Sequence, residues 1–323
     1  MHKMPEDKKP QRKMTEVTLD SHTRPDYEGD QNLLDQILHA DQDIITPFQA
    51  CKLPSLGLYY NWNGIDSCEV RAMNKQVEMM LTKPGMAQDG SAVDKMLEYC
   101  CRFPDNMSPL DLLVGDRNYL MYVIRGITHG NMYKFTTTCP NAECGEAGIY
   151  EFDLNGLSES IVYASPEIKE PYRLVLPHFT QTFGKEVYVG MRFLRGSDLY
   201  KSLHDYKMNK AMLTGGVGGA RVRASRAKSS SGPKENVYSK LVEDMTLDCI
   251  DNVCGEHDRT KIKMFMERAH SADLEVIRAW LDKYMPSVDM TVTVTCNKCS
   301  SDFSIELPMS DYFFRPKKTE RVG

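Results

Sequence analysis

Two pairs of closely spaced cysteines constrain this chain more than any other feature of its sequence. Cys139 and Cys144 lie in the string CPNAEC, and Cys296 and Cys299 lie in CNKC. Each pair is flanked by β-prone sequence: KFTTTC and GIYEF surround the first, and MTVTVTC and DFSIEL surround the second. We therefore expect two β-hairpins, each with two thiols at its tip.

Two tight turns that each offer two cysteines are typical of a zinc ribbon. One tetrahedral Zn²⁺ binds four thiolates at about 2.3 Å, and both spacings bring two sulfurs to one side of a turn. About 150 residues separate the two pairs, so the intervening chain must fold back to the first hairpin. Four sulfur ligands leave no open position for a substrate water, so we expect one structural zinc ion. Its ligands would be Cys139, Cys144, Cys296 and Cys299.

Other interpretations of these cysteines compete with zinc. They can be buried reduced thiols at hairpin turns, or ligands of an iron–sulfur cluster, although nothing else indicates redox chemistry. Disulfides are disfavoured because the N-terminal sequence MHKMPEDKKPQRKM has no apolar core of a signal peptide, so we expect a reducing cytoplasm. A third pair, Cys249 and Cys254, precedes His257 in a stretch expected to be helical, and we interpret both as buried core residues.

The hydrophobic pattern predicts an α+β protein, with a helical body and a small β region that contains the two cysteine-tipped hairpins. Asp116 is expected to cap the clearest helix, and His129 to follow its end. The expected helices are 33–38, 74–82, 89–101, 116–128, 197–212, 236–253, 258–270 and 272–284. The expected strands are 67–73, 132–138, 149–154, 160–164, 173–176 and 186–194, with a second hairpin over 289–307.

Composition divides the chain into five segments. Residues 1–30 are rich in Lys, Asp, Glu and Pro and predict a tail that is disordered or ordered by a partner. Residues 31–157 form the N-terminal helical part with the first zinc knuckle, and residues 158–213 a β-rich insertion with a helix. Residues 214–235 form a basic, Gly- and Ser-rich flexible loop. Residues 236–323 contain the C-terminal helices and the second zinc knuckle.

Two segments are candidate partner-binding surfaces. The basic loop carries Arg221, Arg223 and Arg226 and no acid between 214 and 234. It can contact nucleic acid or an acidic protein, although a solvated insertion is the favoured interpretation. Near the C-terminus, the aromatic side chains are either an anchor for a partner or part of this protein's own core, and both interpretations stay open. These aromatic residues are Tyr312, Phe313 and Phe314.

Several function classes find no support in the sequence. It contains no Walker A, G-x-S-x-G or H-E-x-x-H motif. No stretch approaches the roughly 20 apolar residues of a membrane-spanning helix, and the net charge of −5 gives no global attraction to nucleic acid. We therefore expect no catalysis, no small-molecule substrate and no membrane association. A zinc-ribbon nucleic-acid-binding protein is the alternative to a structural protein.

The order of motifs resembles the T-even-type bacteriophage baseplate hub assembly family. The resemblance runs from about residue 53 to residue 314, and it is interrupted between about 158 and 235. It rests on five passages: LPSLGLYYNWNG, DSCEVRAM, GDRNYLMYVIRGITHG, KFTTTCPNAECGEAGIYEFDL and TVTCNKCSSDFSIELPMSDYFF. The charged N-terminal tail and the basic insertion depart from the family pattern.

The resemblance implies a role in the central hub or wedge region of a contractile-tail baseplate. Members of the family are hub subunits or assembly chaperones, and they carry paired cysteines at the same two places. The implied partners are other baseplate or tail proteins. The implied location is the host cytoplasm during assembly, followed by the tail baseplate of the virion.

Overall fold

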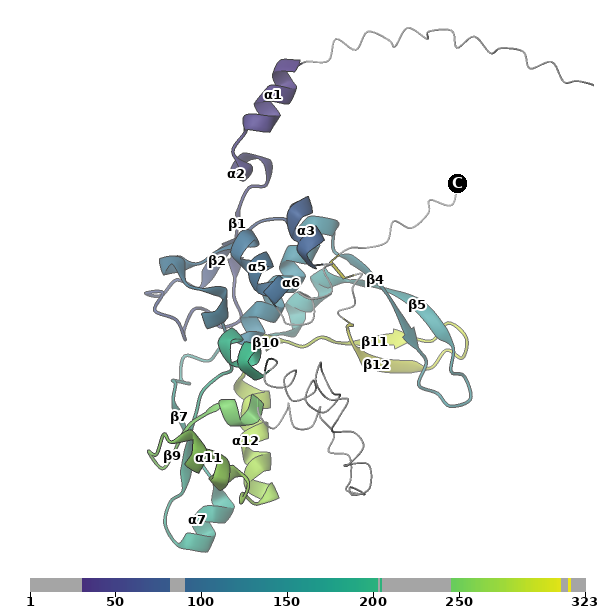
Figure 1. Cartoon of the computed structure of the whole chain (residues 1–323). Coiled ribbons are helices and arrows are strands. Elements are labelled where there is room, and N and C mark those ends of the chain that lie inside the picture. The colour runs from purple at the N-terminus through teal and green to yellow at the C-terminus, as the bar shows by residue number, and fades with distance from the viewer. Residues whose placement is uncertain (1–30, 82–90, 203, 205–244, 309–312, 315–323) are drawn as a thin grey trace, which may run out of the picture. The chain divides into compact units, whose positions relative to one another are not determined.

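The computed structural model describes residues 31–81, 91–202, 204, 245–308 and 313–314. The predicted tail 1–30, the basic loop 214–235 with Arg221, Arg223 and Arg226, and Tyr312 lie outside the described residues. The described part combines helices with several small antiparallel sheets, which confirms the α+β class (Figure 1). Contacts divide the chain into two units, Met1–Ile45 and Thr46–Gly323.

The helices that lie wholly within the described residues are α1 (Gln31–His39), α2 (Gln42–Ile45), α3 (Lys75–Leu81), α5 (Ser91–Cys100), α6 (Val114–His129), α7 (Pro177–Phe183), α11 (Arg259–Met266) and α12 (Ser271–Tyr284). Residues 196–202 and 245–248 are helical as well. Short 3-10 helices cover Pro104–Asn106, Pro109–Asp111 and Leu154–Ser160. None of these helices combines the length and the apolar character that crossing a membrane requires.

The strands form two three-stranded sheets and three two-stranded sheets, with antiparallel pairing throughout the described residues. The three-stranded sheets are β1 (Gln49–Lys52), β2 (Ser67–Val70) and β3 (Cys101–Arg102), and β7 (Tyr172–Val175), β8 (Tyr188–Met191) and β9 (Ile250–Val253). The two-stranded sheets are β4 (Met132–Thr138) with β5 (Ala147–Asp153), β11 (Thr291–Thr295) with β12 (Asp302–Glu306), and β6 (Ile161–Val162) with β10 (Ser287–Val288).

Helix α6 places buried apolar side chains in two of the three hydrophobic cores of the second unit. Leu120 and Ile124 are fully buried in the first core, where α3 and α5 pack near the β1–β2–β3 sheet. Tyr122 points instead into the core beneath the two cysteine hairpins. Gly115, in the first turn, permits close contact with the chain before β10, because a Cβ there would lie 1.8 Å from the carbonyl oxygen of Pro286.

Asp116 does not cap α6, so that expectation is wrong. The helix already begins at Val114, and its cap residue makes no side-chain hydrogen bond. The fully buried Asp116 carboxylate accepts hydrogen bonds from the Ser55 amide at 2.9 Å and the Tyr60 hydroxyl at 2.6 Å. Burial raises the pKa of Asp116 above its usual value, and these hydrogen bonds offset only part of that rise. The carboxylate therefore joins the turn-rich segment before β2 to α6.

The second core lies between the β7–β8–β9 sheet and helix α12. Phe193 stacks on Trp280, with the two ring centroids 5.3 Å apart. Helix α7 lies in the connection between β7 and β8, and its first turn is held by Asp273 of α12. That buried carboxylate accepts hydrogen bonds from the amides of His178 at 2.9 Å and Phe179 at 3.1 Å.

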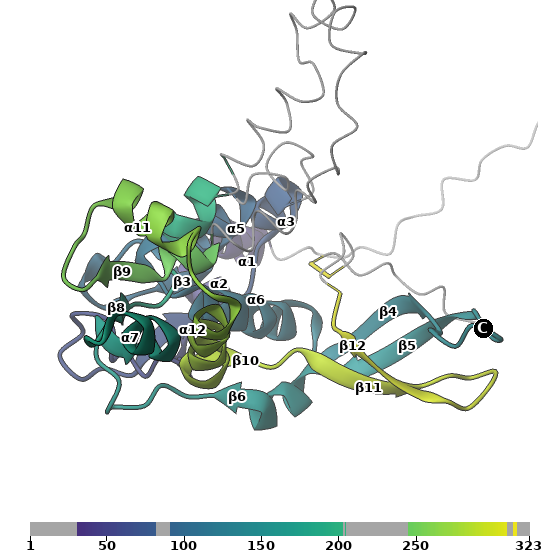
Figure 2. The same ribbon diagram turned by 90° about the horizontal axis from the view of Figure 1, so that it is seen from below.

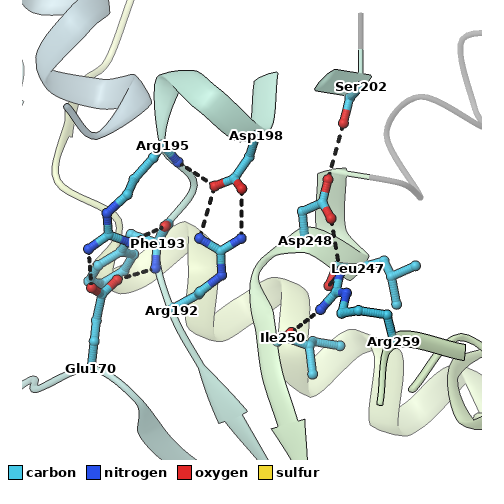
Figure 3. A network of polar contacts seen from close by, with 10 residues as sticks. All are labelled: Glu170, Arg192, Phe193, Arg195, Asp198, Ser202, Leu247, Asp248, Ile250 and Arg259. Atoms are coloured by element: carbon cyan, nitrogen blue, oxygen red, sulfur yellow. Dashed lines mark hydrogen bonds and ion pairs between the residues drawn. The ribbon is translucent and has the colours of Figure 1, made fainter. Parts of the chain in front are cut away.

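Ion pairs and hydrogen bonds between charged side chains fix residues 192–198, which follow β8 (Figure 3). Asp198 accepts two hydrogen bonds from the Arg192 guanidinium, at 2.9 and 2.8 Å, and one from the Arg195 amide at 2.9 Å. Burial raises the pKa of Asp198, but these three bonds and the charge of Arg192 leave it below its usual value. Arg195 also donates to Glu170 at 2.6 Å.

A second set of hydrogen bonds joins residues on both sides of segment 205–244 (Figure 3). Ser202 donates a hydrogen bond to Asp248 at 3.1 Å, and Arg259 of α11 donates to the other oxygen of that carboxylate at 2.9 Å. Arg259 also reaches the carbonyl oxygens of Leu247 and Ile250. Ser202 and Asp248, which lie on either side of segment 205–244, are therefore in direct contact.

The expected helix over 236–253 is wrong at its C-terminal end. Residues 236–244 lie outside the described part, residues 245–248 are helical, and Ile250–Val253 is strand β9, paired with β8. Cys249 is buried as expected, whereas Cys254 is exposed, with a φ of 50°, in the turn after β9. Its interpretation as a core residue was therefore also wrong. The expected helix over 197–212 is described only in its first half, where residues 196–202 are helical, and residues 205–212 lie outside the described part. The other expected helices and strands are present within the described residues, with some ends shifted or shortened.

Candidate metal centre

The first cysteine pair lies in the turn of the β4–β5 hairpin. Strands β4 and β5 pair in register from Met132 opposite Asp153 to Thr138 opposite Ala147. The Cys139 amide donates to the Glu146 carbonyl at 2.8 Å, and the Cys144 amide donates to the Asn141 carbonyl at 2.9 Å. Gly145, directly after the second cysteine, has a φ of 55°. This left-handed residue returns the chain into β5.

The second pair lies in the turn of the β11–β12 hairpin and repeats this local geometry. The Cys296 amide donates to the Ser301 carbonyl at 2.9 Å, and the Ser300 amide donates to the Cys296 carbonyl at 2.9 Å. Ser300, directly after the second cysteine, has a φ of 57°. The two turns thus share a left-handed residue in the same place, although their cysteine spacings differ.

The two hairpins lie side by side in both views (Figures 1 and 2). One hydrophobic core takes side chains from both of them and from α6. Tyr150 of β5 contacts Phe303 of β12 edge to face, with ring centroids 6.1 Å apart. At the tips, Lys298 donates to Glu146 at 2.8 Å, and both side chains are exposed. An exposed ion pair contributes little, so the shared core brings the hairpins together.

The four sulfur atoms lie within 4.8 Å of one another. Cys139 Sγ is 3.7 Å from Cys299 Sγ, and Cys144 Sγ is 3.8 Å from Cys296 Sγ, so each of these contacts joins one hairpin to the other. Four sulfurs at about 2.3 Å from a tetrahedral zinc ion would be about 3.8 Å apart. A disulfide requires about 2.05 Å, and all four cysteines are free thiols.

Hydrogen bonds favour the thiolate form at the second turn. The amides of Cys299 and Lys298 donate to the Cys296 sulfur and lower the pKa of that thiol. The hydroxyl and the amide of Ser301 donate to Cys299 and lower its pKa to about 6. Ser301, Lys298 and the Glu146 amide were not identified from the sequence, because nothing in a single sequence marks a residue that binds a cysteine sulfur.

At the first turn, the neighbouring sulfurs oppose ionisation. The amide of Glu146 lowers the pKa of Cys144, but desolvation and hydrogen bonds with the three other cysteines raise it to about 11. Four thiolates in this space repel one another, so the fully ionised set requires a cation among them. The donor set, the distances and the hydrogen bonds to sulfur all fit a soft divalent ion.

Among the described residues, these four cysteines are the one group of three or more His, Cys, Asp and Glu side chains placed to hold a metal ion. Cys139 and Cys296 are buried, Cys144 is partly exposed and Cys299 is exposed. The remaining buried cysteines are core residues: Cys51, Cys68, Cys100 and Cys101 belong to the first core, and Cys249 to the second.

The structure describes Phe313 and Phe314 of the three C-terminal aromatic residues. Phe313 is fully buried, and its ring contacts Tyr122 and Tyr133 edge to face, at 5.0 and 5.1 Å between ring centroids. Phe314 is partly buried, and its carbonyl oxygen lies 2.8 Å from Nε2 of His129 at the end of α6. These contacts favour the interpretation that Phe313 closes this protein's own core.

The family model described as "T4 bacteriophage base plate protein" matches residues 70–315. The matched region contains both hairpins and all four clustered cysteines. No curated protein and no solved structure matches the chain. The family match supports a structural baseplate protein and does not favour the nucleic-acid-binding alternative.

Proposed function

The chain belongs to the T4 bacteriophage baseplate protein family, and we propose that it is a non-enzymatic structural or assembly protein of the hub or wedge region of a contractile tail baseplate. One zinc ion, held by Cys139, Cys144, Cys296 and Cys299, stabilises it. The protein acts by contacting other baseplate or tail proteins, first in the host cytoplasm and then in the virion. The family match over residues 70–315 is the observation that carries this role.

The sulfur geometry supports zinc as the ion. Contacts of 3.7 and 3.8 Å between sulfurs of different hairpins match the edge of a tetrahedral four-thiolate site. The ion would join Cys144 to Cys296, which are 152 residues apart in sequence. Because such a site does not exist in the unfolded chain, the free energy of metal binding contributes to the free energy of folding.

The closed donor set supports a structural role for the ion. A catalytic zinc site keeps one position for water or substrate, whereas four cysteine sulfurs fill a tetrahedral site. The cysteines also lie in turns whose hairpins are joined by a hydrophobic core. The ion in this proposal fixes the hairpins as one rigid surface of the baseplate subunit.

The baseplate role is tested by quantitative mass spectrometry of purified phage particles and of the infected-cell lysate. A fixed, small copy number in particles supports a structural subunit. Abundance in tail intermediates without incorporation into particles supports an assembly factor, which is the other form of the proposal. Absence from both overturns it, and DNA retention that falls steeply with salt would indicate the nucleic-acid-binding alternative instead.

A further inference from the structure

An apolar groove lies between α7 and α11, on the edge of the second core. Its volume is about 380 Å³, and its walls come from two helices that are far apart in sequence. Phe179 and Phe183 of α7 line one wall, and Met264 and Phe265 of α11 line the other. Lys261 and Arg268 also line it.

Ring contacts and hydrogen bonds hold the walls of the groove in place. Phe179 stacks on Phe265 with 4.7 Å between ring centroids, and Phe183 lies against Phe179 at 6.2 Å. The buried carboxylate of Asp273 holds the first turn of α7 through two backbone amides. Gly184, with a φ of 62°, ends α7 directly after Phe183. A surface fixed in this way loses little conformational entropy when it binds.

Two large apolar side chains of the groove are exposed to water. Phe183 is 66% exposed and Met264 is 49% exposed, one on each wall. Both belong to helices whose other apolar side chains pack into the second core. A groove with aromatic walls and cations at its edge offers apolar anchor contacts of the kind that dominate protein interfaces.

The charges at the groove define the chemistry of the partner. Lys261 and Arg268 contribute two positive charges, and no carboxylate lines the groove among the described residues. The Lys261 ammonium already forms a salt bridge with the Glu256 carboxylate at 2.5 Å. Arg268 is therefore the cation on which recognition depends most. A partner with carboxylates beside its apolar face would complement this surface.

We propose that the groove binds an acidic amphipathic helix of another baseplate protein. This inference rests on the proposed function, which makes the partner a baseplate protein. A helix that lays one apolar face into the groove would cover Phe183 and Met264 together, with its carboxylates beside Arg268. The groove lies within the region that the family model matches.

The test replaces Phe183 with a photoreactive phenylalanine analogue in the full-length chain, expressed in phage-infected cells. Ile149, which is 70% exposed on β5, takes the same analogue in a control protein. Cross-linked peptides are identified by mass spectrometry. We expect position 183 to capture one acidic peptide with an apolar helical repeat from a baseplate protein, and position 149 not to capture that peptide.

Charge reversal then tests the recognition. Arg268→Glu should lower the yield of the cross-link about tenfold, whereas Lys95→Glu, at an exposed position of α5, should leave it unchanged. Recovery of the chain with tail intermediates, but no cross-link from position 183, overturns the groove proposal alone. A cross-link to a basic peptide, or to a second copy of this chain, also overturns it. A chain that associates with no tail protein at all contradicts the baseplate role itself.

Discussion

Replacing Cys296 with serine removes one sulfur from the proposed zinc site and should destabilise the protein. The ion would link the two hairpins and close a loop of 152 residues between Cys144 and Cys296. In the chain-entropy treatment of cross-links, closing a loop of that length stabilises the folded state by about 5 kcal/mol. The three remaining sulfurs can retain the ion weakly, so we expect a loss of roughly 2–5 kcal/mol.

The measurement is urea denaturation followed by circular dichroism, together with the metal content of each purified protein. Wild type should carry one zinc ion per chain, and Cys296→Ser should carry much less. Treating wild type with a chelator should reproduce the loss of stability, but it should change the variant little. Cys254→Ser is the matched control, because this exposed cysteine lies outside the cluster. Its stability should stay within about 0.5 kcal/mol of wild type.

Full metal content and unchanged stability in Cys296→Ser would refute the shared four-sulfur site. Metal-free wild type with the stability of the untreated protein would refute the structural role of the ion, even if zinc binds. A loss of the same size in Cys254→Ser would show that the effect comes from removing any cysteine rather than a metal ligand.

Three further predictions test the fold around the site. Phe313→Ala should lower the free energy of unfolding by about 3–5 kcal/mol, because its ring is fully buried, whereas the same change at the exposed Phe183 should cost under about 0.5 kcal/mol in urea denaturation. Gly115→Ala should cost about 1–3 kcal/mol and lower the Tm, since its methyl group would meet a backbone carbonyl. Asp198→Asn should cost about 1.5–3 kcal/mol near pH 7. Because the pKa of Asp198 is lowered in the folded state, wild type should keep this advantage above about pH 4 and lose it as pH falls further; a difference independent of pH would contradict that assignment.

The sequence predicts the two hairpins because their signals are local. Alternating side chains flank each cysteine pair, and Gly145 follows the first pair where the chain needs a left-handed residue. The main helices are also predictable from their apolar periodicity, and α6 and α12 are the clearest cases. That the four cysteines meet could be inferred only from their number and chemistry, because no local pattern reports a contact across 152 residues.

The errors arise where a distant partner decides the structure. Aspartate is a common helix-capping residue, but Ser55 and Tyr60 bind the Asp116 carboxylate inside the core. Residues 250–253 have a pattern compatible with a helix, but they pair with β8 and form strand β9. Helix α7 was not expected, because Asp273 of α12 supplies the acceptor for its first amides from 94 and 95 residues away.

The hairpin geometry explains why a metal ion would be useful at this place. A two-stranded hairpin is marginally stable on its own, and the β4–β5 and β11–β12 sheets have two strands each. Their shared core is supported by α6 and by the buried ring of Phe313. At the tips, cross-hairpin contact depends on the cysteines and on the exposed pair of Lys298 and Glu146, which contributes little. A zinc ion bound there would therefore fix the ends of the hairpins, where the hydrophobic core does not extend, so its removal should loosen the tips before it unfolds the remaining cores.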